Sequence, residues 1–388
     1  MMLKDRVLAC MQAAMDNHEC PGLSLLVMKD GQEMLYAEAG YADVASARPV
    51  RRDSIFRLYS QSKPVTAAAV MLLVERGMID LMDPVGKYLT GFCDQRVWTR
   101  DGLVPVNRPM QVLDLLGMTS GLCYPDADAP GQYAARLFEE QHELIQKGGG
   151  MDTVTFANRM GELPLAFQPG DQFRYGTSAD VLGAVVEVVS GKPYADFLRE
   201  ELFEPLGMKD TAFWVPEEKR ERFVTCYKRV PGGLEPFHNL HLAVGDYSRM
   251  PAFASGGAGL VSTLDDYAAF ASMLMNEGAY QGKRIMSPAA VRYMTQAQLT
   301  DHASRTYWDN LMGFSYGKLM RIAVHPGQAH YLVREGEYGW DGWLGSYFAN
   351  LPEERVTFLL MQNVTDTGTS AVTRKLRNIV LAGLTSEL

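Results

Sequence analysis

The sequence predicts an α/β (α+β) protein in which both ends of the chain build one antiparallel sheet, with a mostly helical lobe inserted between them. Three observations lead to this prediction. Strand-like runs lie near the N-terminus, at 22–28 and 33–39, and again beyond residue 313. Helical patterns dominate the stretch in between. Apolar residues also recur at helical spacing at both ends, in 3–17 and about 368–384, which indicates two helices that cover the sheet.

The length of the chain bounds its domain organisation. A chain of 388 residues can hold two or three domains, or one two-lobed unit with a sizeable core. Because strands from both ends are expected to share a sheet, we expect a single two-lobed domain over 1–388. The sheet lobe comprises 1–57 and about 250–388, and the helical lobe comprises about 58–249. The cleft between the lobes is the expected pocket.

The individual elements follow from local patterns. Lys29-Asp-Gly-Gln32 separates the first two strands and is typical of a hairpin turn. Further boundaries are read from apolar spacing together with glycine, proline and helix caps. One expected helix begins near Ser60, another ends at 112–116, two more lie at 131–147 and 178–191, and a further one is capped by Ser262 or Thr263. The later strands lie at about 313–323, 328–334, 343–350 and 355–362.

Composition and charge exclude several classes of partner. Hydrophobic residues make up 47% and charged residues 21%, as in ordinary globular proteins. A net charge of −9 argues against nucleic acid or an anionic membrane as a partner, and no transmembrane run is found in the sequence. The five cysteines are odd in number and form no C-x-x-C pair, and charges interrupt any signal-peptide core. We therefore expect a cytoplasmic protein with reduced thiols.

The stretch around Ser60-Gln-Ser-Lys63 is the strongest chemical signal in the chain. Residues from Val65 to Val74 are apolar apart from one threonine, which predicts a buried helix that begins near Ser60. Pro64 is compatible with this helix, since first-turn N–H groups have no partner within a helix. Lys63 then lies on the face of the Ser60 hydroxyl, and burial lowers the pKa of its amine, so it can act as the base for a serine nucleophile. Backbone N–H groups at the helix start favour developing negative charge.

A second match to the same pattern occurs at Ser315-Tyr-Gly-Lys318, inside Gly313-Phe-Ser-Tyr-Gly317, which also spells the esterase motif G-x-S-x-G. The pattern from Phe314 to Val324 predicts a strand, and an offset of three along a strand places side chains on opposite faces. Nor does an apolar helix follow Gly317, as a nucleophile elbow requires. Ser60 is therefore the stronger candidate.

Other chemistries find little support in the sequence. His238 and His241 could share a helical face, but no H-E-x-x-H motif or adjacent acidic pair completes a metal site. Gly256-Gly-Ala-Gly259 does not match the dinucleotide-binding fingerprint, and no P-loop occurs. We therefore expect no metal and no cofactor.

Ser60-Gln-Ser-Lys63, followed by Pro-Val-Thr-Ala, resembles the nucleophile motif of serine β-lactamases and penicillin-binding proteins. The likeness spans most of the chain and is greatest to the class C β-lactamase group and its esterase relatives, the family VIII carboxylesterases. It implies a β-lactamase/transpeptidase-like fold. The further stretches that carry it are Asp80-Leu-Met-Asp-Pro-Val-Gly-Lys-Tyr-Leu, Leu115-Leu-Gly-Met-Thr-Ser-Gly-Leu, Phe203-Glu-Pro-Leu-Gly-Met-Lys-Asp-Thr and Ser255-Gly-Gly-Ala-Gly-Leu-Val-Ser-Thr.

The resemblance also implies roles for individual residues. Ser60 matches the acylated nucleophile and Lys63 its general base. Tyr175, in Tyr-Gly-Thr177, matches the tyrosine of the family's Tyr-x-Asn element, which shares a proton with the serine, the lysine and the leaving group. Thr177 stands where the family has asparagine, at a position that faces substrate. The oxyanion hole is placed at the backbone N–H groups of Ser60 and Trp343.

The family's third motif, Lys/His-Thr-Gly in its antibiotic-recognising members, corresponds here to Trp340-Asp341-Gly342. A tryptophan at its head is similar to the esterase branch, whereas Asp341 is unusual in both branches. Gly342 lets the strand backbone approach the substrate closely. We expect Trp340 to supply only apolar surface and Asp341 to add a negative charge that repels anionic ligands. The alternative is that Asp341 points away from the pocket, because alternate strand residues face opposite sides.

These observations predict a serine hydrolase that forms an acyl-enzyme on Ser60, and above all a carboxylesterase acting on neutral small esters. By the same mechanism, the alternatives are hydrolysis of β-lactams or D-amino-acyl peptides, and transfer of the acyl group to an alcohol or amine. A non-catalytic binding protein on the same scaffold is the alternative of another class. The joint presence of Ser60, Lys63 and Tyr175 argues against it. The expected partner is a small-molecule ester or amide.

Overall fold

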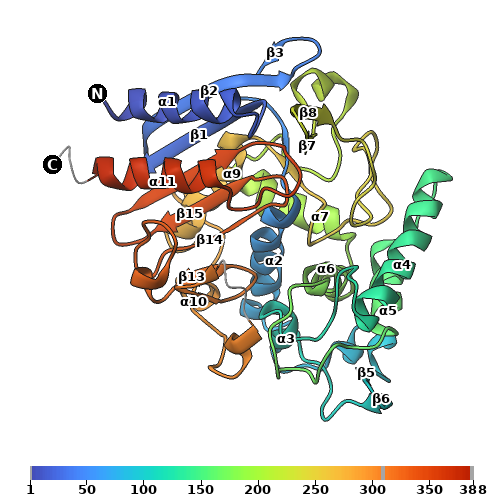
Figure 1. The fold of residues 1–388 in the computed structure, drawn as a ribbon. Helices are drawn as coiled ribbons and strands as arrows, with labels where there is room; N and C mark the ends of the chain where they lie inside the picture. Colours follow the sequence, from blue (N-terminus) through green and yellow to red (C-terminus); the bar gives the residue numbers. More distant parts are fainter. Residues whose placement is uncertain (1, 307–310, 385–388) are drawn as a thin grey trace.

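An eight-stranded antiparallel sheet forms the centre of the computed structural model, which describes residues 2–306 and 311–384. The strand order is β12-β13-β14-β15-β16-β1-β2-β3. Figure 1 shows the blue strands of the N-terminal end beside the red and orange strands of the C-terminal end. The strands are β1 (Gly22–Lys29), β2 (Gln32–Asp43), β3 (Arg48–Pro49), β12 (Phe314–Tyr316), β13 (Arg321–Ala323), β14 (Tyr338–Asp341), β15 (Tyr347–Leu351) and β16 (Val356–Met361).

The pairing of β16 with β1 joins the two ends of the chain. Its register runs from Ser24 opposite Met361 to Lys29 opposite Val356. β1 continues into β2 through a turn in which Asp30 and Gly31 take left-handed backbone conformations, with φ of 50° and 75°. Two-residue hairpin turns of this kind match the twist of the flanking strands. The predicted hairpin and the predicted sheet from both termini are therefore confirmed.

Both faces of the sheet are buried. On one face, the terminal helices α1 (Leu3–Asp16) and α11 (Ala371–Leu384) lie side by side (Figure 1) and share a core with Leu25 and Val27 of β1. On the other face, Leu26 of the same strand packs into the larger core formed with the helices of the middle of the chain. Successive side chains of a strand point to opposite faces, so a continuous apolar run serves both cores.

The middle of the chain is mostly helical, as the sequence predicts. Its helices are α2 (Lys63–Glu75), α3 (Val112–Leu116), α4 (Ala129–Gln146), α5 (Thr153–Gly161), α6 (Ser178–Ser190), α7 (Tyr194–Leu198) and α8 (Glu204–Leu206), followed by α9 (Leu264–Met275) and α10 (Pro288–Met294). Four short antiparallel ribbons accompany them: β4 (Phe56–Arg57) with β9 (Val261–Ser262), β5 (Arg96–Thr99) with β6 (Gly102–Pro105), β7 (Tyr227–Val230) with β8 (Gly233–Pro236), and β10 (Ala279–Tyr280) with β11 (Lys283–Arg284).

Helix α2 is buried on all sides because almost all of its residues are apolar. Every residue from Lys63 to Leu73 is buried. Pro64 lies in the first turn, where the missing N–H costs no hydrogen bond. A 3₁₀ turn, Tyr59–Ser62, precedes the helix and carries Ser60 into the interior. The sequence thus places Ser60 just before a helix that is buried on all sides.

The C-terminal strands differ from the prediction in three places. The run 313–323 is not one strand but the hairpin β12–β13, because the chain reverses between them, where Leu319 has a φ of 57°. The run 328–334 forms no strand. Its apolar side chains Tyr331 and Val333 instead fill a small core beside Phe314. Strand β14 was not among the predicted runs, since Tyr-Gly-Trp-Asp lacks a β-branched residue and contains a glycine.

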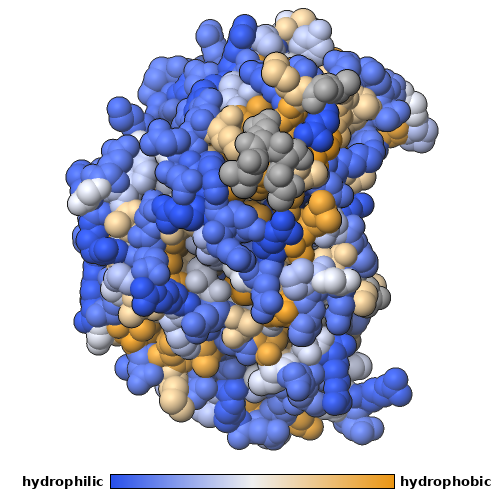
Figure 2. Space-filling view, turned by 90° about the vertical axis from the view of Figure 1, so that its left-hand side faces the viewer, coloured by the Kyte–Doolittle hydropathy of each residue, from blue (hydrophilic) through white to orange (hydrophobic). Residues whose placement is uncertain are grey.

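Polar residues cover much of the side of the molecule toward which the start of α1 and the end of α11 point (Figure 1). Figure 2 shows this side of the molecule mainly in blue, with orange confined to seams and small patches. Such a surface is what amphipathic helices over a buried sheet produce. Within 2–306 and 311–384, no helix has both the length and the apolar character needed to cross a bilayer.

We expect Leu72→Ala to lower the free energy of unfolding by about 2–5 kcal/mol, because it removes a buried side chain of α2 and leaves a cavity. Urea denaturation of the purified protein measures the change. Val188→Ala is the matched control on α6, since Val188 is 41% exposed and should cost less than about 0.5 kcal/mol. A cost below about 1 kcal/mol for Leu72→Ala contradicts a tightly packed α2.

Candidate active site

Backbone strain directly precedes the candidate nucleophile. Tyr59 has a φ of +46°, a left-handed conformation that bulky residues rarely adopt. Its ring is 4% exposed and packs beside the ring of Trp343, with 5.0 Å between centroids. Strained backbone of this kind persists only when its surroundings fix it, and it is typical of functional sites. The strain turns Ser60 into the interior, where the residue is 8% exposed.

The Lys63 amine is fully buried and has three polar neighbours. Its Nζ lies 3.1 Å from the Ser60 Oγ, 3.1 Å from the Tyr124 hydroxyl and 2.9 Å from the carbonyl oxygen of Gly257. A neutral amine has two N–H donors and one lone pair. With the donors directed to Gly257 and Tyr124, the lone pair is left for the Ser60 hydroxyl proton. Ser60 and Lys63 therefore have the geometry of a nucleophile and its base.

Burial also sets the charge state of this amine. Desolvation lowers the pKa of Lys63 to about 7, against the opposing influence of the carboxylates of Asp180 and Asp341. Near neutral pH, a substantial fraction of Lys63 is thus the free base. An ordinary exposed lysine, with a pKa above 10, would be almost fully protonated at this pH.

Tyr175 completes the predicted constellation. Its hydroxyl hydrogen bonds with Ser60 and accepts a hydrogen bond from the Trp340 Nε1, at 3.0 Å. The Lys63 Nζ lies 4.5 Å from the centroid of its ring. Burial raises the pKa of Tyr175 well above its ordinary value, so the phenol keeps its proton. The structure thus brings Ser60, Lys63 and Tyr175 together, and Tyr175 is placed to donate a proton.

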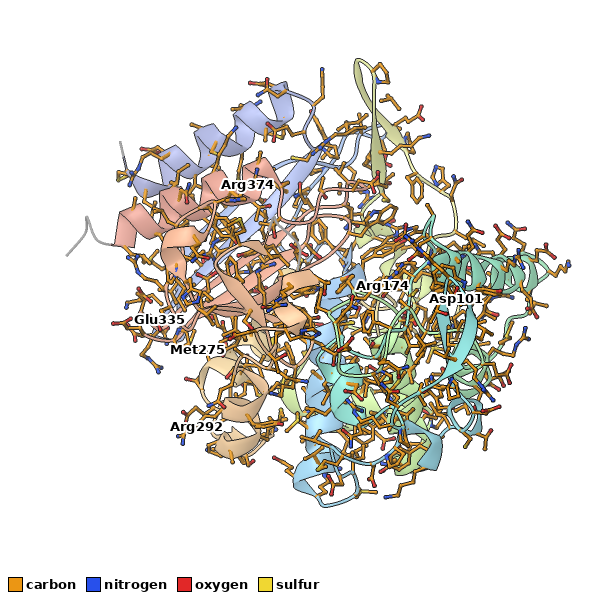
Figure 3. All side chains as sticks on the ribbon, turned by 60° about the horizontal axis from the view of Figure 1, so that its bottom comes forward. Asp101, Arg174, Met275, Arg292, Glu335 and Arg374 are labelled. Atoms are coloured by element: carbon orange, nitrogen blue, oxygen red, sulfur yellow. The ribbon has the colours of Figure 1, made fainter. Side chains whose placement is uncertain are left out.

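Arg174 ties together the loops that carry the two tyrosines. Figure 3 labels it between the sheet and the green helices, and its guanidinium pairs with Asp126 and Asp128, just after Tyr124. The backbone N–H of Arg174 also donates to the carbonyl of Met118, at 2.9 Å. These contacts pull the segment 118–128 against Tyr175. Arginine bound in a fork to carboxylates gives such a junction a fixed geometry.

Sequence analysis missed Tyr124, Asp180 and Gly257. Tyr124 contacts the Lys63 amine, and Asp180 is a buried carboxylate that accepts hydrogen bonds from Ser255 Oγ (2.5 Å) and the Gly257 N–H (3.0 Å). Asp180 lies in the first turn of α6, where an acidic residue is commonly explained by the helix dipole. The apolar pattern of α6 predicts that Asp180 is buried. Because a buried carboxylate needs hydrogen-bond donors, this pattern could have indicated that Asp180 has polar partners from other elements.

Gly342 brings the predicted oxyanion residue to the nucleophile. A Cβ at this position would lie 2.2 Å from the carbonyl oxygen of Leu58 and 2.5 Å from the Ser346 Oγ, so only glycine fits. The Ser346 Oγ itself donates to the Leu58 carbonyl at 3.0 Å. In the described part of the chain, the Trp343 N–H has no hydrogen-bond acceptor. Together with the N–H of Ser60, which lies in the first turn of its helix, it can serve as an oxyanion donor.

Two expectations for the third motif need correction. Trp340 does not supply only apolar surface, because its indole N–H is bound to Tyr175. Asp341 does not bring an uncompensated negative charge to the pocket. Its Oδ2 lies 3.2 Å from the Nη1 of the buried Arg321 and accepts a hydrogen bond from Thr369. The physical reason is the alternation along β14, which turns Asp341 away from the face of Trp340.

The other candidate residues have other neighbours, and one of them, His241, lies against the oxyanion candidate Trp343. Thr177 is 2% exposed and lines a small interior cavity with Leu137 of α4. In the alternative motif, Ser315 belongs to β12, whereas the Lys318 ammonium lies 4.0 Å from the centroid of the Tyr293 ring. His241 stacks on Trp343, with 3.8 Å between ring centroids. Among the described residues, no group of three or more His, Cys, Asp or Glu is arranged to hold a metal.

A large cavity lies beside this centre. It has a volume of about 1030 Å³ and is lined by the end of α4, residues 148–150 and the segment 238–253. Ser255 and Gly259 also line it, and they flank Gly257, whose carbonyl is bound to Lys63. The cavity therefore adjoins the catalytic candidates without enclosing Ser60 itself.

A family model described as Beta-lactamase matches residues 7–382. The chain belongs to this family. The resemblance drawn from its motifs is therefore confirmed, and the family places the chain among serine hydrolases.

Among the curated relatives of the chain, Protein Rv1367c of Mycobacterium tuberculosis is 31% identical and covers 89% of the chain and 87% of its own length. Esterase EstB of Burkholderia gladioli is also 31% identical, over 98% of the chain and 95% of its own length. Among solved structures, EstCE1, described as a hydrolase with promiscuous acyltransferase activity, has a TM-score of 0.84 and 27% identity, covering 97% of this chain and 98% of its own. The β-lactamase/transpeptidase-like fold is confirmed.

We expect the kcat/KM for an ester to rise with pH through a midpoint near 7, because Lys63 acts as base only after it loses its proton. Asp180→Asn should move this midpoint to lower pH, since the carboxylate of Asp180 raises the pKa of Lys63. The amide oxygen still accepts from Ser255 and Gly257. Initial rates between pH 5 and 9 measure both midpoints, and a shift to higher pH contradicts the assignment of the base.

Gly342→Ala should lower kcat/KM by about 10²–10³-fold, because the added Cβ forces the end of β14 away from Leu58 and moves the Trp343 N–H. Hydrolysis of a 4-nitrophenyl ester measures the loss. Gly327→Ala is the matched control, since a Cβ there meets no atom within 4 Å, and it should retain wild-type activity. Near-normal activity of Gly342→Ala would remove Trp343 from the oxyanion hole.

Proposed function

We propose that this protein is a carboxylesterase that forms an acyl-enzyme on Ser60 and hydrolyses small neutral esters. The observation that carries the proposal is the buried Lys63 amine, 3.1 Å from the Ser60 hydroxyl, with the Tyr175 hydroxyl bound to the same serine. Burial lowers the pKa of this amine to about 7, so that near neutral pH a substantial fraction of it is unprotonated and can accept the serine proton. Relatives whose names identify them as an esterase and a hydrolase support this choice of activity.

In the acylation step, the Ser60 Oγ forms a bond to the ester carbonyl carbon while its proton passes to Lys63. The N–H groups of Ser60 and Trp343 stabilise the oxyanion of the tetrahedral intermediate. The intermediate then collapses as the bond to the leaving alkoxide breaks. Tyr175 gives its hydroxyl proton to this alkoxide and takes the proton held by Lys63 in return, so Lys63 is again a free base.

In the deacylation step, a water molecule gives a proton to Lys63 and its oxygen attacks the acyl carbon. The bond to the Ser60 Oγ breaks, the serine regains its proton and the carboxylic acid leaves. An alcohol or amine in place of water gives acyl transfer with the same proton movements. The description of EstCE1 as having promiscuous acyltransferase activity makes this transfer the second candidate function.

Neutral esters are the proposed substrate class because the end of β14 offers no cation to a substrate carboxylate. The described strand reads Tyr338-Gly-Trp-Asp341, and the Arg321 guanidinium beside it is bound to Asp341. β-Lactams and D-amino-acyl peptides carry such a carboxylate and are therefore the weaker candidates. The adjoining cavity of about 1030 Å³ has the size of small-molecule sites.

We also propose that the chain is one two-lobed domain and works in the cytoplasm. Its largest apolar core includes Phe348 of the sheet as well as Phe156 and Leu182 of the helices, which supports a single unit. All five cysteines are free, which suits a reducing compartment.

Ser60→Ala should abolish ester turnover and labelling by a fluorophosphonate probe, and Lys63→Ala and Tyr175→Phe should each lower kcat by about 10²–10⁴-fold. Intact-mass spectrometry after labelling, combined with a panel of neutral and carboxylate-bearing esters, measures both effects. Ser315→Ala is the matched control from the second Ser-x-x-Lys motif and should behave as wild type. Turnover by Ser60→Ala, or its loss in Ser315→Ala, would overturn the proposal, and an unlabelled wild type would favour a binding protein.

A further inference from the structure

The end of β14 is fixed, on the side away from Trp340, by an ion pair between Asp341 and the buried Arg321. We infer that Asp341 is a positioning residue, which through Arg321 and Thr369 fixes the segment 364–370 and thereby the backbone N–H of Trp343. The inference rests on the proposed function, because it concerns the oxyanion donor of that reaction. In this inference, Asp341 positions a donor that stabilises the transition state, and it does not act by repelling anionic ligands.

Asp341 is held by two partners at once. Its Oδ2 lies 3.2 Å from the Nη1 of Arg321 and accepts a hydrogen bond from the Thr369 hydroxyl. The same Nη1 of Arg321 donates to the Thr369 Oγ1 at 3.4 Å, so the three side chains form a closed triangle. Arg321 is only 1% exposed. A charge buried to this degree needs a counter-charge, and Asp341 supplies one from the strand that leads to Gly342.

The segment that Asp341 contacts through Thr369 also encloses Trp343. The N–H of Thr367 donates to the Trp343 carbonyl at 3.1 Å, and the Trp343 Nε1 donates to the Asp366 Oδ1 at 2.7 Å. One residue further on, the N–H of Val364 donates to the carbonyl of Leu344 at 3.0 Å. Trp343 is thus held at its carbonyl and at its indole by the segment 364–370, while its own N–H remains available.

Helix α11 anchors the far end of this segment. Arg374, labelled in Figure 3 on α11, donates from Nη1 to the carbonyl of Thr369 at 2.7 Å. Thr369 is therefore fixed by α11 through its backbone and by Asp341 through its side chain. Of these two attachments, only the one through Asp341 connects directly to β14, the strand that leads to Gly342. Removing the carboxylate leaves the Thr369 hydroxyl without its acceptor and takes away the negative charge that contacts Arg321.

Displacement of the segment 364–370 would affect the reaction because an oxyanion donor, here the Trp343 N–H, acts only over a narrow range of distances from the oxyanion. Donors need to lie about 2.7–3.1 Å from the oxyanion, and loss of one donor typically costs about 10²–10³-fold in rate. The tetrahedral state depends on these donors far more than the bound ester does. A shift of the Trp343 N–H should therefore lower kcat and leave KM nearly unchanged.

The test compares Asp341→Ala, Asp341→Asn and Thr369→Val with the wild type. We expect Asp341→Ala to lower both kcat and the rate constant of fluorophosphonate labelling by about 10–100-fold, with KM within about 2-fold. Asp341→Asn keeps an oxygen that accepts from Thr369 and Arg321, so it should recover activity to within about 5-fold of the wild type. Thr369→Val should fall between the two. The inhibition constant of an arylboronic acid, whose adduct with Ser60 places a hydroxyl in the oxyanion hole, should rise in parallel with the loss in kcat/KM.

Glu337→Gln is the matched control for the structural cost of disrupting a buried ion pair. Glu337 precedes β14 at its other end and pairs with Arg377 at 2.6 Å, and the side chains of both residues are almost fully buried. This variant should lose stability but keep the labelling rate constant of the wild type. Partial unfolding reduces the amount of labelled protein and not the rate constant, so the two effects are separable.

Three results would overturn the inference: Asp341→Ala that labels at the wild-type rate, a boronic acid constant that does not change, or an equal loss in Glu337→Gln. Failure of the proposed function is distinct, because the wild type itself would then fail to be labelled at Ser60.

Discussion

Burial of the Lys63 amine is the constraint on which the rest of the structure depends. A lysine can act as a base near neutral pH only where water is excluded, and this requires a helix that is covered on every side. α2 meets the requirement because its apolar residues contact both the sheet side and the helical middle of the chain. The free-energy cost of burying this polar amine is offset by its hydrogen bonds with Gly257 and Tyr124 and by the nearby carboxylate of Asp180. The apolar packing around α2 therefore both stabilises the fold and lowers the pKa of Lys63.

The candidate centre is assembled from three distant parts of the chain that hold one another in place. The strained turn at Tyr59 presents Ser60, the loops joined by Arg174 bring in the two tyrosines, and the end of β14 approaches at Gly342. At the last of these junctions, a Cβ on Gly342 would collide with Leu58 and Ser346, so no larger residue fits there. A site of this kind is organised before substrate arrives, which favours rate more than tight binding of the ground state.

Sequence analysis succeeded where the signal is local. Ser60 and Lys63 are one helical turn apart, and an apolar run marks the strands β1 and β16 directly. It failed where partners come from tertiary contact: Tyr124 binds the Lys63 amine from a separate loop, Asp180 of α6 binds the N–H of Gly257, and the Trp340 N–H was assigned no partner. The segment 328–334 has the apolar residues of a strand. Its side chains fill a small core, but its backbone does not pair with a neighbouring strand. Asp341 shows the same limit, because no short pattern links it to Arg321.

The pairing of β1 with β16 has a consequence for the order in which the protein can be made. Leu26 and Leu359 are partners in the middle of the sheet, yet almost the whole chain separates them. At ordinary translation speeds, the first hairpin is exposed for on the order of tens of seconds before its neighbour is synthesised. During that time one apolar strand has an open edge, which is the situation in which nascent chains associate wrongly or engage chaperones. The same topology means that a chain interrupted before residue 356 loses the centre of its sheet together with the partner of its first strand.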